Sequence, residues 1–383
     1  MIEVKNKANC TGCHACAALC PKNCIHMIAD GEGFLYPSVQ EDLCVCCGLC
    51  EKVCPVMEKA ARFDEVSTYA CFNKNEEIRM QSSSGGIFTL LAERVLQKGG
   101  VVFGAAFTEE FQVAHSYTET TDGLAKLRGS KYTQSTIGDT YRQAEDFLKK
   151  GRYVLFTGTP CQIGGLLAYL KIDYKTLITQ DIICHGVPSP KIWEQYMHYR
   201  EKEANARTKA VSFRSKVAGW KNYTVEFQFA DQRNYRQSFH QDLYMKGFLA
   251  DLCLRPSCYQ CRFKGIQRQA DITLADFWGI QNVMKDMDDD KGTSLVLVHS
   301  PKGQALLDEV SEALEVKPVN PETALKYNPS ALRSPKLRKN RNKFIRKIHV
   351  ANFEKMVTNY TKRSFIRKCL SMAKRILKKV CGK

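Results

Sequence analysis

The 383-residue sequence predicts a chain of mixed class, α+β and α/β, with a small cysteine-rich module, a mixed α/β body and a basic helical tail. Three observations lead to this prediction. Two matched runs of cysteines occupy residues 1–58. Beyond them, buried strands, tight glycine loops and apolar helices follow one another, which is typical of doubly wound α/β folds. From Leu332 to Lys383 the chain contains 18 Lys or Arg residues and one acidic residue.

The two cysteine runs share one spacing, C-x2-C-x2-C-x3-C-P, at Cys10–Pro21 and Cys44–Pro55. This is the spacing of bacterial two-cluster ferredoxins, in which three cysteines of a run bind one cubane and the fourth binds the other. The spacing therefore predicts a ferredoxin-like module with one 4Fe–4S centre at Cys10, Cys13, Cys16 and Cys54. It predicts a second centre at Cys44, Cys47, Cys50 and Cys20. Cys24 and Cys46 lie outside the pattern, and we expect them to be small hydrophobic residues rather than ligands.

Two other uses of cysteine fit these runs less well. A disulfide framework needs an oxidising compartment and would produce two matched runs only by chance. Structural zinc sites use paired C-x2-C motifs but rarely this triple spacing ended by Cys-Pro. The N-terminus has no apolar signal region and no run is long enough to cross a bilayer. We therefore expect a cytoplasmic protein whose cysteines stay reduced.

The net charge of +17 is concentrated in the tail. The rest of the chain has 39 basic and 39 acidic residues, so the body is neutral and we expect no nucleic-acid partner. The expected domains are 1–58, 66–145, 146–330 and 331–383. From Ser364 onward, apolar and basic residues alternate as in an amphipathic helix. Such a helix could touch an anionic membrane surface, and packing against the body is an equally good alternative.

The first half of the body contains two small-residue segments. Ser82–Gly86 precedes an apolar helix from Ile87 to Leu96, which the serines can cap, and Val101–Phe107 is typical of a buried strand. Free amides at such a helix N-terminus suit an anion, although an ordinary serine cap is equally consistent. Leu127–Tyr132 combines basic, aromatic and glycine residues, which suit a phosphate and a ring as well as any surface loop.

The second half predicts a further cysteine site. A strand leads into Thr157–Gln162, with a helix from Ile163 to Leu170, and another strand over 177–183 ends in Cys184. Cys161 and Cys184 therefore follow neighbouring strands, where α/β sheets hold their ligands.

Antiparallel strands over 209–240 lead to a C-x2-C pair at Cys258 and Cys261, which in a reduced chain indicates a metal site. Four thiolates need two partners, for which Cys161 and Cys184 are preferred. Cys253, expected on the preceding helix, is the reserve. We therefore expect a third 4Fe–4S centre.

Taken in order, the body motifs resemble the family of coenzyme F-420 hydrogenase/dehydrogenase beta subunits over roughly residues 66–315. The motifs are Ser83–Gly86, Gly129–Tyr132, Thr157–Gln162, Cys184–Gly186, Arg255–Cys261 and Asp271–Gly279. Each is weak alone, whereas the ordered set is specific. The resemblance implies FAD near Ser84, Gly85, Gly86, Lys131, Thr157, Gly158 and Thr159. It also implies that Cys161, Cys184, Cys258 and Cys261 surround the third cluster.

We therefore expect an iron–sulfur, flavin-dependent oxidoreductase that passes electrons between the clusters and a two-electron carrier or small molecule through FAD. Ferredoxin or another redox protein is the expected partner. His185 is a candidate proton donor by residue type, with a structural role equally open.

Two other hypotheses remain. In the first, the chain is a non-catalytic subunit that relays electrons to a partner enzyme. Family members beside cell-surface polysaccharide genes suggest such a setting. In the second, the cysteines hold zinc in a colourless scaffold.

Overall fold

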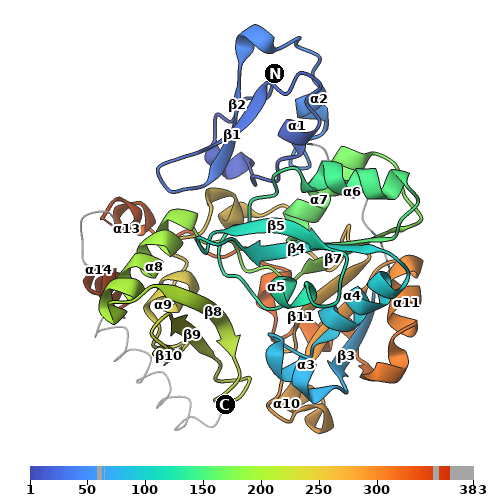
Figure 1. Cartoon of the computed structure of the whole chain (residues 1–383), viewed down its shortest axis with the longest axis vertical. Helices are drawn as coiled ribbons and strands as arrows, with labels where there is room; N and C mark the ends of the chain where they lie inside the picture. The colour runs from blue at the N-terminus through green and yellow to red at the C-terminus, as the bar shows by residue number, and fades with distance from the viewer. Residues whose placement is uncertain (58–62, 64, 348–352, 363–383) are drawn as a thin grey trace, which may run out of the picture.

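The computed structural model describes residues 1–57, 63, 65–347 and 353–362. The N-terminal module lies at one end of the molecule, above a large mixed sheet, and a smaller three-stranded lobe lies beside that sheet (Figure 1). This arrangement confirms the predicted class, a small module joined to a mixed α/β body. In the described residues, no helix has both the length and the apolar character needed to cross a membrane.

The N-terminal module contains one antiparallel hairpin, β1 (Ile25–Ala29) with β2 (Leu35–Val39), and two short helices, α1 (Ala15–Ala18) and α2 (Leu49–Lys52). The two cysteine runs repeat one backbone shape. Gly12 and Cys46 are equivalent positions, as are His14 and Gly48, and all four have φ between 51° and 72°. His14 and Gly48 end their loops and are the residues at which helices α1 and α2 begin. The shared spacing therefore produces two loops that turn in the same way around two separate sites.

The large sheet has eight strands in the order β13-β3-β12-β11-β7-β6-β4-β5. Strands β4, β6, β7 and β11 are parallel, while β12, β13 and β5 pair antiparallel with their neighbours. The bounds are β3 (Ser67–Asn73), β4 (Val101–Phe107), β5 (Val113–Thr118), β6 (Val154–Thr157), β7 (Leu177–Ile182), β11 (Ile272–Asp276), β12 (Ser294–Val298) and β13 (Leu314–Pro318).

Helices cover both faces of this sheet. Along β4, Val101 and Phe103 pack into one hydrophobic core and Val102 packs into the other, as the alternation of strand side chains requires. The first core includes α6 (Thr140–Lys149), α7 (Pro160–Leu170) and the N-terminal module. The second includes α4 (Ile87–Gln97) and α11 (Pro301–Asp308). The module is thus an integral layer over the α6–α7 face.

The three-stranded lobe consists of β8 (Thr208–Ser215), β9 (Thr224–Phe229) and β10 (Asn234–Ser238). Its aromatic core is shared with α8 (Pro190–Ala204), α9 (Leu243–Leu249), α13 (Arg341–Lys347) and α14 (Phe353–Thr361). Phe344, Phe353 and Met356 bring the first part of the basic tail into this core. The segment predicted to be amphipathic, from Ser364 onward, lies outside the described residues.

The remaining described elements are short. The helices are α3 (Glu76–Gln81), α5 (Leu124–Leu127), α10 (Ile280–Val283) and α12 (Pro321–Leu325). The 3-10 segments are η1 (Lys7–Asn9), η2 (Glu41–Leu43), η3 (Pro256–Gln260), η4 (Lys285–Met287), η5 (Ser311–Ala313) and η6 (Pro329–Ala331).

Three local expectations were wrong. Helix α7 begins at Pro160 rather than Ile163, because Thr159 and Gln162 form a capping box and proline suits the first helical position. The serines do not cap α4, which begins after Gly86 in a left-handed conformation (φ 82°). Cys253 lies beyond the preceding helix, since α9 ends at Leu249.

Candidate functional site

The first group of cysteines combines both runs of the N-terminal module. Cys10, Cys13 and Cys16 come from the first run, and Cys54 arrives from the end of the second. Burial, together with the neighbouring charges of Cys10 and Cys54, raises the pKa of the Cys13 thiol to about 12. Burial likewise raises the pKa of Cys16, with added repulsion from the other three. The four sulfurs are therefore close enough to interact, as a shared cluster requires.

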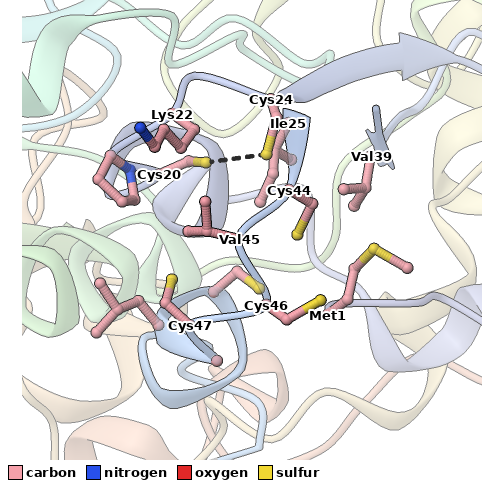
Figure 2. A pocket seen from close by; sticks show the side chains of 14 residues that line it. Met1, Cys20, Lys22, Cys24, Ile25, Val39, Cys44, Val45, Cys46 and Cys47 are labelled. Atoms are coloured by element: carbon pink, nitrogen blue, oxygen red, sulfur yellow. Dashed lines mark hydrogen bonds between the residues drawn. The ribbon is translucent and has the colours of Figure 1, made fainter. Parts of the chain in front are cut away.

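The second group lies near the surface of the module. Cys20, Cys44, Cys47 and Cys50 line a cavity of about 20 Å³ together with Met1, Val39 and Val45 (Figure 2). The amide of Ile2 donates to Cys50 Sγ over 3.3 Å. Cys24 is buried with its sulfur 3.4 Å from that of Cys20 (Figure 2). Cys46 is exposed, so the expectation of a small hydrophobic residue fits Cys24 and not Cys46.

The third group is in the body and contains Cys161, Cys184, Cys258 and Cys261. Burial raises the pKa of Cys161 well above its ordinary value, and the charges of the other three thiolates act in the same direction. The amide of Val187 donates to Cys258 Sγ over 3.4 Å, and the hydroxyl of Thr159 lies 3.2 Å from Cys161 Sγ. The structure thus gathers four cysteines from the first turn of α7, the loop after β7, and η3 with the residue that follows it.

Cys253 lies elsewhere. It is 1% exposed and packs into the aromatic core of the small lobe. After burial, the charges that act on its pKa come from Arg341, Asp251 and Glu32. Within the described part of the chain, no three His, Cys, Asp or Glu side chains converge as a single metal ion requires.

Helix α7 connects the first and third groups. A Cβ added to Gly165 would lie 2.9 Å from Cys13 Cβ and 3.1 Å from Cys13 Sγ, so this glycine touches the first group directly. Cys161 of the third group precedes Gly165 by four residues, which is about one helical turn or 6 Å along the axis. One helix therefore contacts two of the three cysteine groups.

The loops predicted to bind flavin meet at the carboxyl ends of the parallel strands. The backbone amide and the hydroxyl of Ser130 donate to Ser83 Oγ over 2.8 and 2.9 Å. Gly104 lies between Thr157 and Leu127, the latter just before Gly129. A Cβ on Gly104 would be 2.9 Å from Thr157 Oγ1 and 3.6 Å from Leu127 Cβ. The segments 83–86, 129–132 and 157–159 are thus neighbours in space, although they lie far apart in sequence.

Many side-chain donors in these loops already have acceptors within the protein. Lys131 Nζ donates to the carbonyls of Lys126, Leu127 and Arg128 over 2.9 to 3.1 Å, and burial lowers its pKa to about 7. Ser84 Oγ donates to Thr293 O (3.0 Å), and Thr157 Oγ1 donates to Phe103 O (2.9 Å).

The glycines and Thr159 have packing and capping roles. The amide of Gly85 donates to Ser294 Oγ (2.9 Å), Gly158 N donates to Gln180 O (3.1 Å), and Gly86 and Thr159 begin helices. These glycines and Thr159 therefore shape the loops predicted to bind flavin, and the hydrogen bonds above already use most of the side-chain donors of these loops.

His185 is held by partners on both ring nitrogens. Its Nε2 lies 2.8 Å from Asp251 Oδ1, and its Nδ1 lies 3.2 Å from Ser330 Oγ. The side chain is 32% exposed, and its ring edge meets Phe248.

The sequence prediction missed two buried basic residues, Arg214 in β8 and Lys216 directly after that strand. Arg214 has a side chain that is 3% exposed, with Nη1 bonded to Asp276 and to Tyr132 Oη, while its Nε and Nη2 have no partner among the described residues. Lys216 Nζ donates to the carbonyls of Arg79, Ser84 and Lys291, and burial lowers its pKa to about 7. The available signal was two basic residues, in Ser-Phe-Arg-Ser-Lys, on an otherwise alternating strand.

Family models match nearly all of the module and body. Residues 9–57 match the 4Fe-4S dicluster domain. Residues 68–140 match the N-terminal part of the coenzyme F420 hydrogenase/dehydrogenase beta subunit, and residues 151–322 match its C-terminal part. The N-terminal module is therefore a 4Fe–4S dicluster domain.

Known proteins are similar to both the module and the body of the chain. One subunit of the F(420)H(2) dehydrogenase of Methanosarcina mazei is 23% identical over 210 residues, covering 51% of this chain and 60% of that protein. Ferredoxin 7Fe of Hydrogenibacillus schlegelii is 45% identical over 42 residues, covering 11% of this chain and 47% of the ferredoxin. The chain thus spans about 60% of the first relative and about half of the second. A chain of the F420-reducing [NiFe] hydrogenase complex from Methanosarcina barkeri aligns with a TM-score of 0.46 at 17% identity, covering 72% of this chain and 97% of that one.

Proposed function

Because the chain belongs to the family of coenzyme F420 hydrogenase/dehydrogenase beta subunits, we propose that it is an iron–sulfur flavoprotein oxidoreductase. In this proposal, electrons pass between the two ferredoxin-type clusters and a two-electron carrier or small molecule, through a third 4Fe–4S centre and FAD. A redox protein such as ferredoxin exchanges electrons at the outer cysteine group, which is the second group described above.

The observation that supports this proposal most strongly is the serial arrangement of the three cysteine groups. The outer group lies at the surface, where Cys47, Leu43 and Val45 are exposed. The first group lies deeper, against Gly165 of α7, and the third lies at the N-terminus of the same helix. Thr159, beside Cys161, belongs to the loop cluster that the resemblance assigns to FAD. The groups therefore follow one another from the module surface, through the module, to the body and its strand ends, which is the order of an electron relay.

The residues at the strand ends fit an anionic, aromatic cofactor. Arg214 supplies two buried donor nitrogens, Nε and Nη2, without partners among the described residues, and its guanidinium carbon lies 4.2 Å from the Tyr223 ring centroid and 5.4 Å from that of Trp278. Asp276 and Tyr132 hold the guanidinium in place. When bound, FAD would accept two electrons as hydride and release them singly to one-electron clusters. Arg214 would bind and orient an anionic group of the cofactor at the strand ends.

His185 is the proposed proton donor. Its partial exposure allows exchange with solvent, and the contact of Nε2 with Asp251 Oδ1 fixes the orientation of the ring. Its ring contacts Phe248, which packs against Tyr132 of the proposed flavin loops at 5.1 Å between centroids.

The proposal is tested by turnover of the isolated full-length chain. Reduced methyl viologen serves as the electron donor and coenzyme F420 as the hydride acceptor, because the family is named for that coenzyme. Arg214→Met should release FAD during purification and lose turnover, while the iron content stays at the level of the unchanged chain. Arg200→Met is the matched control, since Arg200 is a buried arginine of the same lobe that packs on Tyr199 and Tyr235. Full FAD content in Arg214→Met would contradict the assigned site.

A second candidate function, a non-catalytic relay subunit, is favoured by a different observation. The side chains of Lys131 and Thr157 direct their donors to backbone carbonyls of the protein itself. In this case the isolated chain should transfer electrons from viologen to an added oxidised ferredoxin and should reduce no small molecule. Flavin-free protein with that behaviour would favour the relay over the oxidoreductase.

A further inference from the structure

Arg255 connects the N-terminal module to the third cysteine group. It is fully buried, at 0% exposure. Its Nε donates to Cys10 O over 2.8 Å, and its Nη2 donates to Leu35 O over 2.8 Å. Nη2 also lies 3.7 Å from Cys10 Sγ, within the range of an N–H···S hydrogen bond. A side chain of the body thus reaches a cysteine predicted to bind the first cluster.

The module is shaped to receive this guanidinium. A Cβ on Gly12 would lie 2.8 Å from Arg255 Nη1, so only glycine leaves room for it, and Gly12 also has a positive φ of 69°. The rings of Tyr36 and Phe34 lie 4.3 and 5.3 Å from the guanidinium carbon. Gln134 Oε1 accepts from Nη1 over 2.8 Å. The contact is therefore a built socket that surrounds the charge.

The backbone of Arg255 belongs to the third group. Its carbonyl accepts from the amide of Cys258 over 2.9 Å, and its own amide donates to Val187 O over 2.9 Å. Val187 in turn donates its amide to Cys258 Sγ. One residue therefore fixes Cys10 through its side chain and Cys258 through its main chain.

The acceptors around Arg255 are carbonyl oxygens, an amide oxygen and a sulfur, so its positive charge is not neutralised by the partners that hold it. Arg341 provides a contrast within the same chain. It is also buried between body and module, but it pairs with the carboxylate of Glu32. Hydrogen bonds to cluster sulfurs and nearby positive charge favour the reduced, more negative state of a cluster.

We propose that Arg255 is a positioning residue that sets the reduction potential of the cluster at Cys10, Cys13, Cys16 and Cys54. It also fixes the position of that cluster relative to the third centre. The inference rests on the proposed function, because it requires both centres to be occupied.

The test is a redox titration of the anaerobically purified full-length chain, followed by electron paramagnetic resonance of each cluster. In Arg255→Gln, one cluster should become harder to reduce by about tenfold in its equilibrium constant, which is about 59 mV for a one-electron couple. Arg255→Lys keeps the charge and should recover most of that shift. Arg341→Gln should leave all cluster potentials unchanged, although it removes an interface contact of similar burial.

A second variant keeps the inference testable if Arg255→Gln fails to fold. Gln134→Glu leaves Arg255 in place and sets a carboxylate against Nη1, so it should lower the same potential. Unchanged potentials in both variants, or equal shifts in Arg341→Gln, would overturn the role of Arg255. Absence of the third cluster signal from the unchanged chain would instead overturn the proposed function, which separates the two failures.

Discussion

The outer and third cysteine groups differ in how the chain assembles them and in whether a member is exposed. The outer group takes three cysteines from the second run and Cys20 from the first, lines a small surface cavity and includes the exposed Cys47. The third group is assembled from α7, the loop after β7, and η3 with Cys261, and its four cysteines are half-buried. The outer group is determined by local cysteine spacing, whereas the third group depends on how distant segments pack.

Under the proposed function, this difference gives the two cysteine groups different roles in electron transfer. A surface cluster can exchange electrons with another protein, because electron donors must approach it. Under the proposed function, the third group would pass electrons to the loops at the strand ends, and none of its four cysteines is as exposed as Cys47. We expect the two groups to fail in different ways when a cysteine is removed.

The largest expected effect is the loss of a single centre. Cys258→Ala should remove about four irons and abolish turnover of a small molecule, while the N-terminal module still accepts electrons from a dye. Cys47→Ala should also remove about four irons, but turnover driven by a small dye should persist and turnover driven by ferredoxin should fall. The measurements are iron content and rates with each donor. Equal loss with dye and ferredoxin in Cys47→Ala would contradict an outer role for that group.

An intermediate effect is expected at the contact between helix α7 and the first group. Gly165→Ala would place a Cβ 2.8 Å from Tyr141 Oη and 2.9 Å from Cys13 Cβ. Overpacking typically costs about 1–3 kcal/mol, which exceeds the roughly 0.5–1 kcal/mol that alanine gains over glycine within a helix. Urea unfolding should therefore show net destabilisation, together with a changed signal from the first cluster.

Gly31→Ala is the control for that variant. A Cβ on Gly31 meets no atom within 4 Å, although the residue lies in the same module. Wild-type stability in both variants would mean that the module does not rest on α7 as described.

The smallest expected effect is the pH dependence contributed by His115. Burial lowers the pKa of His115 to about 4, and its ring donates from Nε2 to Thr157 O while Nδ1 accepts from Ser135. Between about pH 6.5 and 4 the unfolded chain binds this proton and the folded chain does not, so stability falls as the pH is lowered. The slope is about 1.4 kcal/mol per pH unit for one such group. The free energy of unfolding, measured in urea, should differ less between pH 7 and pH 5 in His115→Gln than in the unchanged chain. An equal difference in both proteins would contradict the contribution of His115.

The sequence was sufficient where chemistry depends on local spacing. Two runs of cysteine predicted the dicluster domain, and Val101–Phe107 was predicted as a strand with the bounds that β4 has. The cluster ligands and the flavin residues remain predictions, although the structure brings Cys161, Cys184, Cys258 and Cys261 together.

The sequence was insufficient where a role depends on tertiary packing. Arg214 and Arg255 are charged residues that pattern analysis would assign to the surface, yet both are buried by segments far away in the chain. Cys253 was a plausible ligand by its distance from Cys258, but it is buried in the aromatic core of the small lobe, and the charges that act on its pKa come from Arg341, Asp251 and Glu32.

The most direct test of the relay is the cofactor content of anaerobically purified full-length chain. We expect about twelve irons, about twelve sulfides and about one FAD per chain, since each of three cubanes holds four irons. About eight irons without flavin would contradict it, because the dicluster domain would then be the whole of the redox machinery and the body would hold neither the third centre nor the cofactor.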